Sequence, residues 1–170
     1  MIKFIKATVK HADDLGLVHA SSWKAAYQGI VPQSYLDQLT AQSRAAFFKK
    51  AVPMSKHAFY IAYSDGKPVG MISFGKARDQ ELAENVGEIS ALYYRSNVWG
   101  KGYGRQLMDL AIRQLKEQNY KTVSLWVFEQ NAHARRFYEK YGFVFDGKKE
   151  ELEIGGKKLT EMRYHYQIPD

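Results

Sequence analysis

The stretch from residue 57 to residue 94 limits the fold most, because three strand-like runs follow one another there. Residues 57–64 and 67–75 have strand-like patterns, and only Asp65-Gly66 separates them. An Asp-Gly pair predicts a two-residue hairpin turn, since glycine readily takes the positive φ that such a turn needs. A third strand is expected at 86–94. The chain is therefore expected to build a sheet whose neighbouring strands run mainly antiparallel.

Helical and strand-like patterns alternate through the rest of the chain. Further strands are expected at 2–8, 121–128, 143–145 and 159–168, with Gly155-Gly156 as a hairpin turn. Helices are expected at 12–27, 33–39, 41–51, from the glycine-rich turn at 100–104 to about Asn119, and from Asn131 as N-cap to Gly142. Together these elements predict an α/β fold of the mixed α+β kind, with a twisted, mainly antiparallel sheet of about seven strands flanked by helices.

The composition is that of one globular domain, which we expect to span residues 1–170. Hydrophobic residues make up 45% of the chain and charged residues 25%, which excludes a disordered or collagen-like chain. No apolar run reaches the roughly 18–20 residues that cross a bilayer, and residues 1–4 show no signal-peptide pattern. The absence of cysteine excludes disulfides, a thiolate nucleophile and cysteine-bound metal, so we expect a cytoplasmic protein with no membrane partner.

The charge balance is basic, with a formal net charge of +7. Such an excess can serve nucleic acid, anionic lipid or a phosphate-bearing small molecule. The basic residues are scattered, however, and no long block of like charges occurs. A nucleic-acid-binding surface predicts clustered Lys and Arg beside exposed aromatic residues, so we expect no nucleic-acid partner.

A glycine-rich turn, Gly100-Lys101-Gly102-Tyr103-Gly104-Arg105, separates an expected strand from an amphipathic helix. Alternate glycines let the backbone approach a ligand closely, and successive N–H groups at a helix N-terminus can converge on a phosphate. An ordinary glycine-rich connection is the alternative. The P-loop pattern is absent, and the dinucleotide pattern G-x-G-x-x-G fails because position 105 is not glycine.

Residues 88–104 read EISALYYRSNVWGKGYG, and residues 131–143 read NAHARRFYEKYGF. The first segment resembles the acetyl-CoA motif of the GNAT family of N-acetyltransferases, and the second resembles the N-x-x-A-x-x-F-Y-x-x-x-G-F segment of that family. The expected order of elements is also similar to the GNAT fold over nearly the whole chain. One departure is Trp99, which stands where the family's phosphate loop usually begins with Arg or Gln.

The resemblance implies a site for acetyl-CoA as co-substrate. The pantetheine arm would lie along Leu92 to Tyr94 like an added strand. The pyrophosphate would rest on the amides from Gly100 to Arg105, and Asn131 would bond the arm or an ordered water while also capping its helix. The implied cofactor-binding residues are Leu92, Tyr93, Tyr94, Trp99, Gly100, Lys101, Gly102, Tyr103, Gly104, Arg105, Asn131 and Tyr138.

The implied chemistry is attack of a neutral amine on a thioester, directly in a ternary complex. Tyr138 matches the family's general acid near the departing sulfur, and the alternative is a core aromatic residue. Glu88 is the candidate base, directly or through water, and the alternative is a solvent-facing charge. No cysteine is present and no Ser–His pairing is apparent, which disfavours a covalent route. The histidines show no metal-ligand spacing, so no metal is expected.

The acceptor is expected to be a primary amine of a small molecule or a peptide. Trp23 and Tyr27 stand four apart on one helical face, where they would either bind the acceptor or pack in the core. Four acidic residues would favour a cationic amine at the acceptor mouth or else form a charged loop, namely Asp79, Glu81, Glu84 and Glu88. The alternative function is a non-catalytic acyl-CoA-binding regulatory module. Edge strands near the C-terminus could pair two copies as a homodimer.

Overall fold

The computed structural model describes all 170 residues, and one seven-stranded sheet forms its centre. The strands are β1 (Ile2–Lys6), β2 (Ala58–Ser64), β3 (Lys67–Lys76), β4 (Val86–Tyr94), β5 (Thr122–Phe128), β6 (Val144–Ile154) and β7 (Lys157–Gln167). Their order across the sheet is β1-β2-β3-β4-β5-β7-β6, and every neighbouring pair is antiparallel except β4 and β5. The predicted mainly antiparallel sheet of about seven strands is confirmed.

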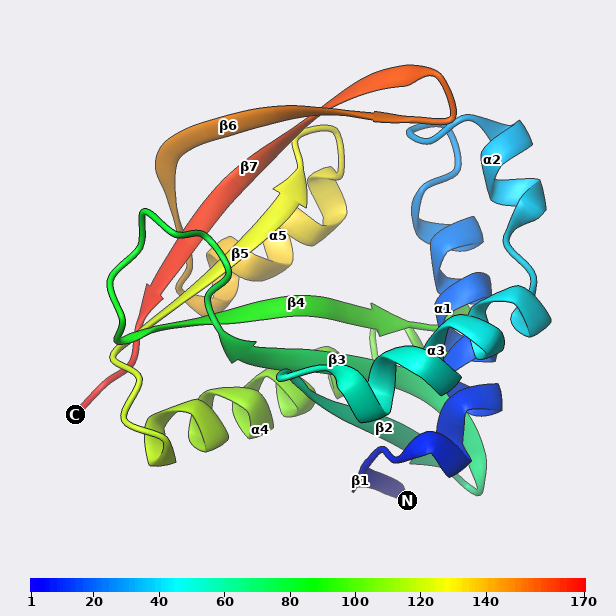
Figure 1. Cartoon of the computed structure of the whole chain (residues 1–170), viewed down its shortest axis with the longest axis horizontal. Helices are drawn as coiled ribbons and strands as arrows, with labels where there is room; N and C mark the ends of the chain where they lie inside the picture. The colour runs from blue at the N-terminus through cyan, green and yellow to red at the C-terminus, as the bar shows by residue number, and fades with distance from the viewer.

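Helices flank this sheet on both sides (Figure 1). The α-helices are α1 (Ala12–Ala26), α2 (Gln33–Gln38), α3 (Ala41–Met54), α4 (Tyr103–Glu117) and α5 (Ala132–Tyr141), and the 3-10 helices are η1 (Val9–His11) and η2 (Ser96–Val98). None of these helices combines the length and the apolar character needed to cross a membrane.

Two packed clusters hold the helices against the two faces of the sheet. In the larger one, α4 residues such as Leu107 and Met108 pack on Ile72 of β3 and on Leu125 of β5. In the second, α1 and α3 pack on the other face, around Met71 of β3. Residues 71 and 72 point to opposite faces because successive strand side chains alternate. The sheet is therefore buried on both sides where β3 and β4 lie.

The predicted hairpin turns have the backbone conformation that their sequences favour. Asp65 and Gly66 have φ of 49° and 77°, and Gly155 and Gly156 have φ of 58° and 82°. Two successive positive φ values match a type I′ turn, whose twist suits a two-residue hairpin. Asn119 also takes a positive φ, of 70°, just after the end of α4, as expected for a C-terminal residue.

The expected short strand at 143–145 is wrong in length, because β6 runs from Val144 to Ile154. Its middle residues are polar, DGKKEELE from 146 onward, and therefore lack the apolar alternation that predicts a strand. As the outer strand of the sheet, β6 is mostly exposed, and its register shifts between Phe145 and Lys149. An edge position and a bulge both allow this polar sequence.

The pair formed by β4 and β5 determines where a site can lie. These strands are parallel neighbours only where Val86–Glu88 of β4 meets Thr122–Ser124 of β5. Beyond that point β5, which pairs with β7 along its whole length, diverges from β4 and leaves a V-shaped opening between the two halves of the sheet (Figure 1).

Candidate functional site

The opening exposes one edge of β4 that has no strand partner. On its other edge β4 stays paired with β3, from Gly87 opposite Lys76 to Tyr94 opposite Gly70. On the β5 side the pairing stops at Glu88, so the edge of β4 from Ile89 to Tyr94 has no strand partner there, and main-chain groups of alternate residues, such as Leu92 and Tyr94, point into the opening. Unpaired N–H and C=O groups on such an edge can bond an extended, amide-bearing ligand in the manner of an added strand.

A bulge in β4 changes which side chains reach each face. Phe74 lies opposite Ile89 and Ser73 lies opposite Ala91, so Ser90 is an extra residue in β4. Bulges of this kind bend a strand and turn its following side chains. After the bulge, Ala91 and Tyr93 pack with the α1–α3 cluster.

The glycine-rich turn lies between the end of β4 and the start of α4. Gly100 and Gly102 both have φ of +80°, and a Cβ built on either would have no atom within 4 Å. The space in front of both glycines is therefore open, and Tyr103 begins α4 immediately after them. A phosphate placed there would meet free N–H groups and the positive end of the helix. The backbone of this turn fits a pyrophosphate next to the free edge of β4.

Trp99 connects the start of this turn to β4 and to α5. Its Nε1–H donates a hydrogen bond to the carbonyl oxygen of Tyr94 over 3.0 Å, and its ring stacks on His133 with centroids 5.5 Å apart. The Arg or Gln usual at this position would offer polar donors to a phosphate, whereas Trp99 ties η2 to the end of β4 and to the start of α5. Positive charge near the turn comes from Lys101 and Arg105 instead.

Asn131 and Tyr138 bring α5 to the opening. The Asn131 side-chain oxygen accepts a hydrogen bond from the backbone N–H of Ala134 over 3.2 Å, so the predicted cap is present. Tyr138 packs against Phe143, with ring centroids 5.8 Å apart. Burial raises the pKa of Tyr138 above its usual range, and the nearby phenol of Tyr93 adds to this shift. The phenol therefore keeps its proton at neutral pH and can act as a donor.

Glu88 is buried, with only 3% of its surface exposed, so the alternative of a solvent-facing charge is wrong. Its Oε1 accepts a hydrogen bond from Nε of Arg78 over 2.7 Å and lies 3.9 Å from Nε2 of His57. A buried carboxylate requires such partners, because an unpaired charge would be costly to desolvate. Glu88 therefore enters the site as half of an ion pair with Arg78.

A histidine and a serine form a pair that the sequence pattern does not reveal. Nδ1 of His57 lies 2.9 Å from Oγ of Ser90, and Nε2 of His57 lies 2.8 Å from the carbonyl oxygen of Lys76. The carbonyl can only accept, so Nε2 carries a hydrogen, and in the neutral imidazole Nδ1 accepts from the serine hydroxyl. The expectation that no Ser–His pairing exists is wrong, because 33 positions separate the two residues in sequence.

Glu161 is a further candidate site residue, one that the sequence pattern does not single out. It lies on β7, opposite Phe128 of β5 and Glu150 of β6. Burial raises the pKa of Glu161 to about 7, and the negative charges of Glu150, Asp79 and Glu88 contribute. The negative charge of Glu161 also raises the pKa of Tyr27 and Tyr93, so its carboxylate lies within electrostatic reach of both phenols. Its surroundings come from strands β5 and β6, which are distant in the chain, so a local sequence pattern does not reveal them.

The acidic stretch at 79–88 is largely neutralised by basic side chains. Arg163 bonds Glu81 over 2.5 Å and lies 3.4 Å from Asp79. Lys76 pairs with Glu84, and Arg78 pairs with Glu88 as described. The stretch therefore acts mainly as a charged loop tied to β3 and β7, which was the alternative expected from the sequence.

Trp23 and Tyr27 close the opening at the end of α1. Their rings meet edge to face, with centroids 4.7 Å apart. Tyr27 contacts Phe128 of β5 at 5.1 Å, and Trp23 stacks on His19 at 5.3 Å. These contacts join α1 to β5 across the opening, so both residues pack and border the site.

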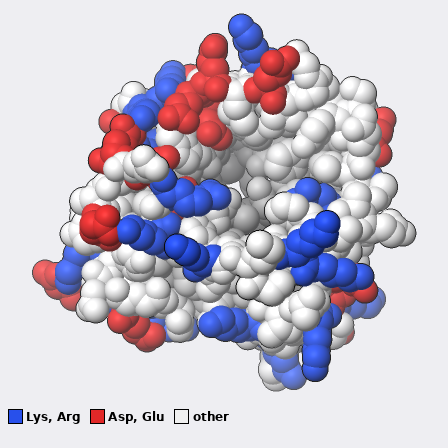
Figure 2. Space-filling view, viewed as in Figure 1, with Lys and Arg blue, Asp and Glu red and all other residues white.

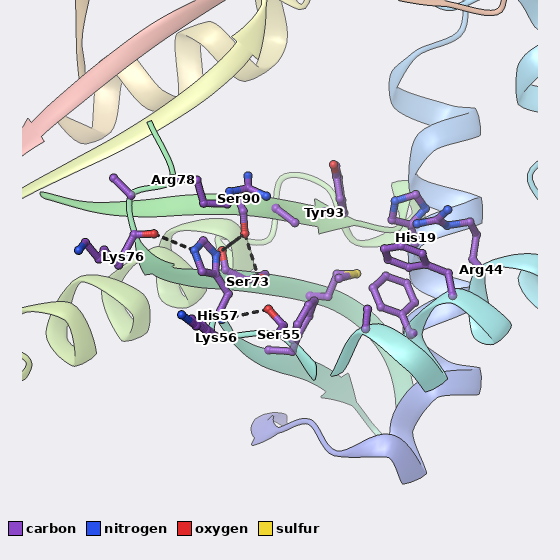
Figure 3. Close-up of a pocket in the computed structure, with 17 residues that line it drawn as sticks. His19, Arg44, Ser55, Lys56, His57, Ser73, Lys76, Arg78, Ser90 and Tyr93 are labelled. Carbon is purple, nitrogen blue, oxygen red and sulfur yellow. Dashed lines mark hydrogen bonds between the residues drawn. The ribbon is translucent and has the colours of Figure 1, made fainter. Parts of the chain in front are cut away.

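A cavity of about 580 Å³ lies on the α1–α3 face, below the opening. Figure 3 shows His19 and Arg44 at one end of it, and His57, Ser90 and Arg78 at the other. The phenol of Tyr93 stands between these ends and extends toward the half of the sheet that contains β5 and β7. Figure 2 shows a hollow near the middle of this face, with acidic side chains gathered above it and basic side chains below it and to its left. Its volume suits a small-molecule acceptor.

Comparison with known proteins decides the family. The sequence profile described as the acetyltransferase (GNAT) family matches residues 21–143. The chain belongs to the GNAT family. An uncharacterized N-acetyltransferase of Bacillus subtilis is 28% identical over 95% of this chain and 91% of its own length. A spermine/spermidine N(1)-acetyltransferase of the same species is 30% identical over 57% of this chain and 64% of its own length.

Solved structures confirm the GNAT fold. The PaiA N-acetyltransferase of Thermoplasma acidophilum, in complex with coenzyme A, has a TM-score of 0.72 with 22% sequence identity. The match covers 98% of this chain and 99% of that one. This GNAT chain is thus an acetyltransferase by family, and it has the GNAT fold.

In the GNAT chain, the segments that carry the residues implied for the cofactor are joined to one another. The glycine turn follows the free edge of β4, and α5 contacts this turn where the ring of His133 stacks on Trp99. Leu92 and Tyr94 can offer only main-chain groups to a ligand in the opening, because their side chains pack against the larger core cluster, which includes α4. Arg105 lies with its guanidinium 5.4 Å from the ring centroid of Tyr141. Glu88 does not join this group, since it lies on the cavity side with Arg78.

No group of three or more His, Asp and Glu side chains is arranged to hold a metal ion.

Proposed function

We propose that residues 1–170 form one GNAT domain that transfers the acetyl group of acetyl-CoA to a primary amine of a small molecule or peptide. The transfer is direct, in a ternary complex of the protein with both substrates. The observation that carries this proposal is the free edge of β4 after Glu88, with the open glycine turn at one end and Tyr138 beside it.

The backbone of β4 and the glycine turn would hold the donor. Leu92 and Tyr94 would bond the pantetheine amides through the main-chain groups on the free edge, and Tyr93, whose main chain pairs with Met71 of β3, would lie beside the arm. The N–H groups from Gly100 to Arg105 would bind the pyrophosphate, and the amide nitrogen of Asn131 can still donate while its oxygen caps α5. Acetyl-CoA would supply the acetyl thioester whose carbonyl carbon the amine attacks.

Tyr138 would act at the sulfur. As the amine nitrogen bonds to the acetyl carbon, the carbon–sulfur bond breaks and negative charge develops on the sulfur. Because burial keeps the Tyr138 phenol protonated, it can donate a hydrogen bond to that sulfur and then its proton. Its contact with Phe143 holds the ring in place, which would keep the hydroxyl positioned to donate this proton.

A carboxylate would take the proton that the amine loses. Glu88 is one proposed base, although its Oε1 already accepts a hydrogen bond from Arg78. Glu161 is the second and is favoured by its environment. Its pKa of about 7 gives it both an ionised fraction and a useful proton affinity at neutral pH.

The relatives suggest which acceptors to test first. One of them is named for spermine and spermidine, and polyamines are primary amines, so polyamines belong among the amines to be tested. The cavity beside β4 gives room for any small amine.

The test is thiol release from acetyl-CoA against a panel of polyamines, amino sugars, amino acids and short peptides, with CoA affinity measured by calorimetry. Amine-dependent release is expected. CoA binding without release from any amine would instead favour a regulatory acyl-CoA-binding module. No CoA binding would contradict the assignment of the glycine turn. Mass spectrometry of the protein after incubation with acetyl-CoA should find no acetyl group on Ser90, and its presence would contradict direct transfer.

A further inference from the structure

The charges around the cavity are unevenly compensated. The residues that line it include Arg44, Lys56, Lys76 and Arg78 but no Asp or Glu. Lys76 pairs with Glu84 and Arg78 pairs with Glu88, whereas Arg44 and Lys56 form no ion pair. In Figure 3 the ammonium group of Lys56 points outward beside His57, so Arg44 is the cation that remains inside the cavity.

The side chain of Arg44 is held in place by aromatic rings. It extends from α3 with its guanidinium carbon 4.3 Å from the ring centroid of Phe47 and 5.6 Å from that of Phe48. Its Nε atom is buried and has no hydrogen-bond partner. A buried guanidinium N–H without an acceptor is unfavourable, and an oxyanion would relieve this cost by accepting it.

His19, which lines the same end of the cavity, does not compensate the positive charge of Arg44. Nδ1 of His19 is also buried without a partner. Burial, and then the positive charge of Arg44, lower the pKa of His19 to about 3. His19 is therefore neutral at physiological pH. This end of the cavity has one unbalanced positive charge and a second polar atom without a partner.

The same end connects to the reacting centre through Tyr93. The ring of His19 meets the ring of Tyr93 edge to face at 5.2 Å. The charge of Arg44 also acts on the phenol of Tyr93, which in turn acts on Tyr138. A small molecule bound at Arg44 would thus extend along Tyr93 toward the opening where the acetyl group is transferred.

We propose that the acceptor of this enzyme is an amine that also carries a carboxylate, of the amino-acid type, and that Arg44 binds the carboxylate. This inference rests on the proposed acetyl transfer and names its substrate class. One guanidinium balances a single negative charge, which suits a carboxylate better than a phosphate dianion. The apolar wall of Phe47, Phe59 and Met71 further favours an apolar side chain on the acceptor. A polyamine would instead bring further positive charge to a cavity that already holds an uncompensated cation.

The experiment compares amines that carry a carboxylate with amines that lack one. L-phenylalanine, L-leucine and L-methionine are tested against their amides, phenethylamine and spermidine. The amino acids should have a kcat/KM at least about 10-fold higher than the corresponding amides, because hydrogen bonds to a charged partner have this effect on affinity. This comparison uses the unaltered protein, so it does not depend on whether a variant folds.

The variant Arg44→Gln should raise KM for the amino acids about 10- to 100-fold and leave KM for the amides unchanged. Lys50→Gln is the matched control, because Lys50 is an exposed residue of α3 that does not line the cavity. It should behave as the unaltered protein. Equal use of amides and acids, with no effect of Arg44→Gln, would overturn the inference and leave the acetyl transfer intact.

Calorimetry with L-phenylalanine on the CoA-bound protein tests the carboxylate site at Arg44 separately from the proposed acetyl transfer. Binding that Arg44→Gln abolishes, without any thiol release, would support the carboxylate site and contradict the proposed transfer. Release with spermidine but no binding of any amino acid would overturn the carboxylate site alone.

Discussion

At the scale of single residues, Tyr138 has the most specific role. Replacing Tyr138 by Phe removes the phenolic proton and keeps the ring that packs on Phe143. We expect kcat to fall about 100-fold, which is typical for the loss of a general acid, with CoA affinity unchanged.

Tyr141→Phe is the control for this change. It removes a hydroxyl from the same helix, one that bonds Asp109 rather than facing the opening, so turnover should be retained. A Tyr138→Phe enzyme with full turnover would show that the tyrosine only packs.

Glu161 makes a second residue-level prediction through the pH dependence of turnover. A base with a pKa of about 7 must lose its proton to act, so kcat should rise as pH increases through 7 and then level off. Glu161→Gln should remove this rise and lower the plateau. Glu88→Gln should retain the rise if Glu161 is the base, whereas loss of the rise in Glu88→Gln alone would transfer the role to Glu88.

At this scale the sequence predicted residue types better than their surroundings. Asn131 caps α5 as its position before an amphipathic run indicates. The burial of Glu88, the pairing of His57 with Ser90 and the position of Glu161 depend on strands that are distant in the chain. A local pattern carries no information about such contacts.

At the scale of elements, the glycine turn should be the most sensitive part of the donor site. Gly102→Val places a β-branched side chain at φ of +80° and fills the open space in front of the turn. We expect the Kd for CoA to rise at least about tenfold, measured by calorimetry.

Gly147→Val is a matched control. Gly147 has φ of +96° and likewise has no atom within 4 Å of a built Cβ, but it lies on β6. This variant should lose stability without losing CoA affinity. If Gly102→Val bound CoA as tightly as the unaltered protein, the phosphates would have to lie elsewhere.

Elements with local signals were predicted well. The hairpin turns at Asp65-Gly66 and Gly155-Gly156 and the amphipathic helix after the glycine turn have signals within a few residues. The polar strand β6 has none, since its stability comes from pairing with β7 over the length of the hairpin. The separation of β4 from β5 after Glu88, on which the site depends, is also a property of the assembled sheet.

At the scale of the whole molecule, buried His19 should make the fold sensitive to acid. Its pKa is about 3 in the folded protein, against an ordinary value of 6.5. As pH falls below 6.5 the unfolded chain takes up a proton that the folded chain does not, so stability decreases. At pH 5 this difference is about 2 kcal/mol.

Denaturant unfolding at pH 7.5 and pH 5 measures this effect. His19→Gln should lose about 2 kcal/mol less stability between these pH values than the unaltered protein. His133→Gln, at an exposed histidine, should show the original pH dependence. An unchanged pH dependence in His19→Gln would contradict the burial of His19 in neutral form.

If acetyl-CoA binds in the opening between β4 and β5, amide hydrogen exchange with and without CoA should show where it lies. We expect slower exchange in peptides that cover residues 89–94 and 100–105, because these peptides contain the free edge of β4 and the glycine turn. Peptides from β1 and β2, far across the sheet, should be unaffected. Protection that is absent from both segments, although CoA is bound, would show that acetyl-CoA does not bind in this opening.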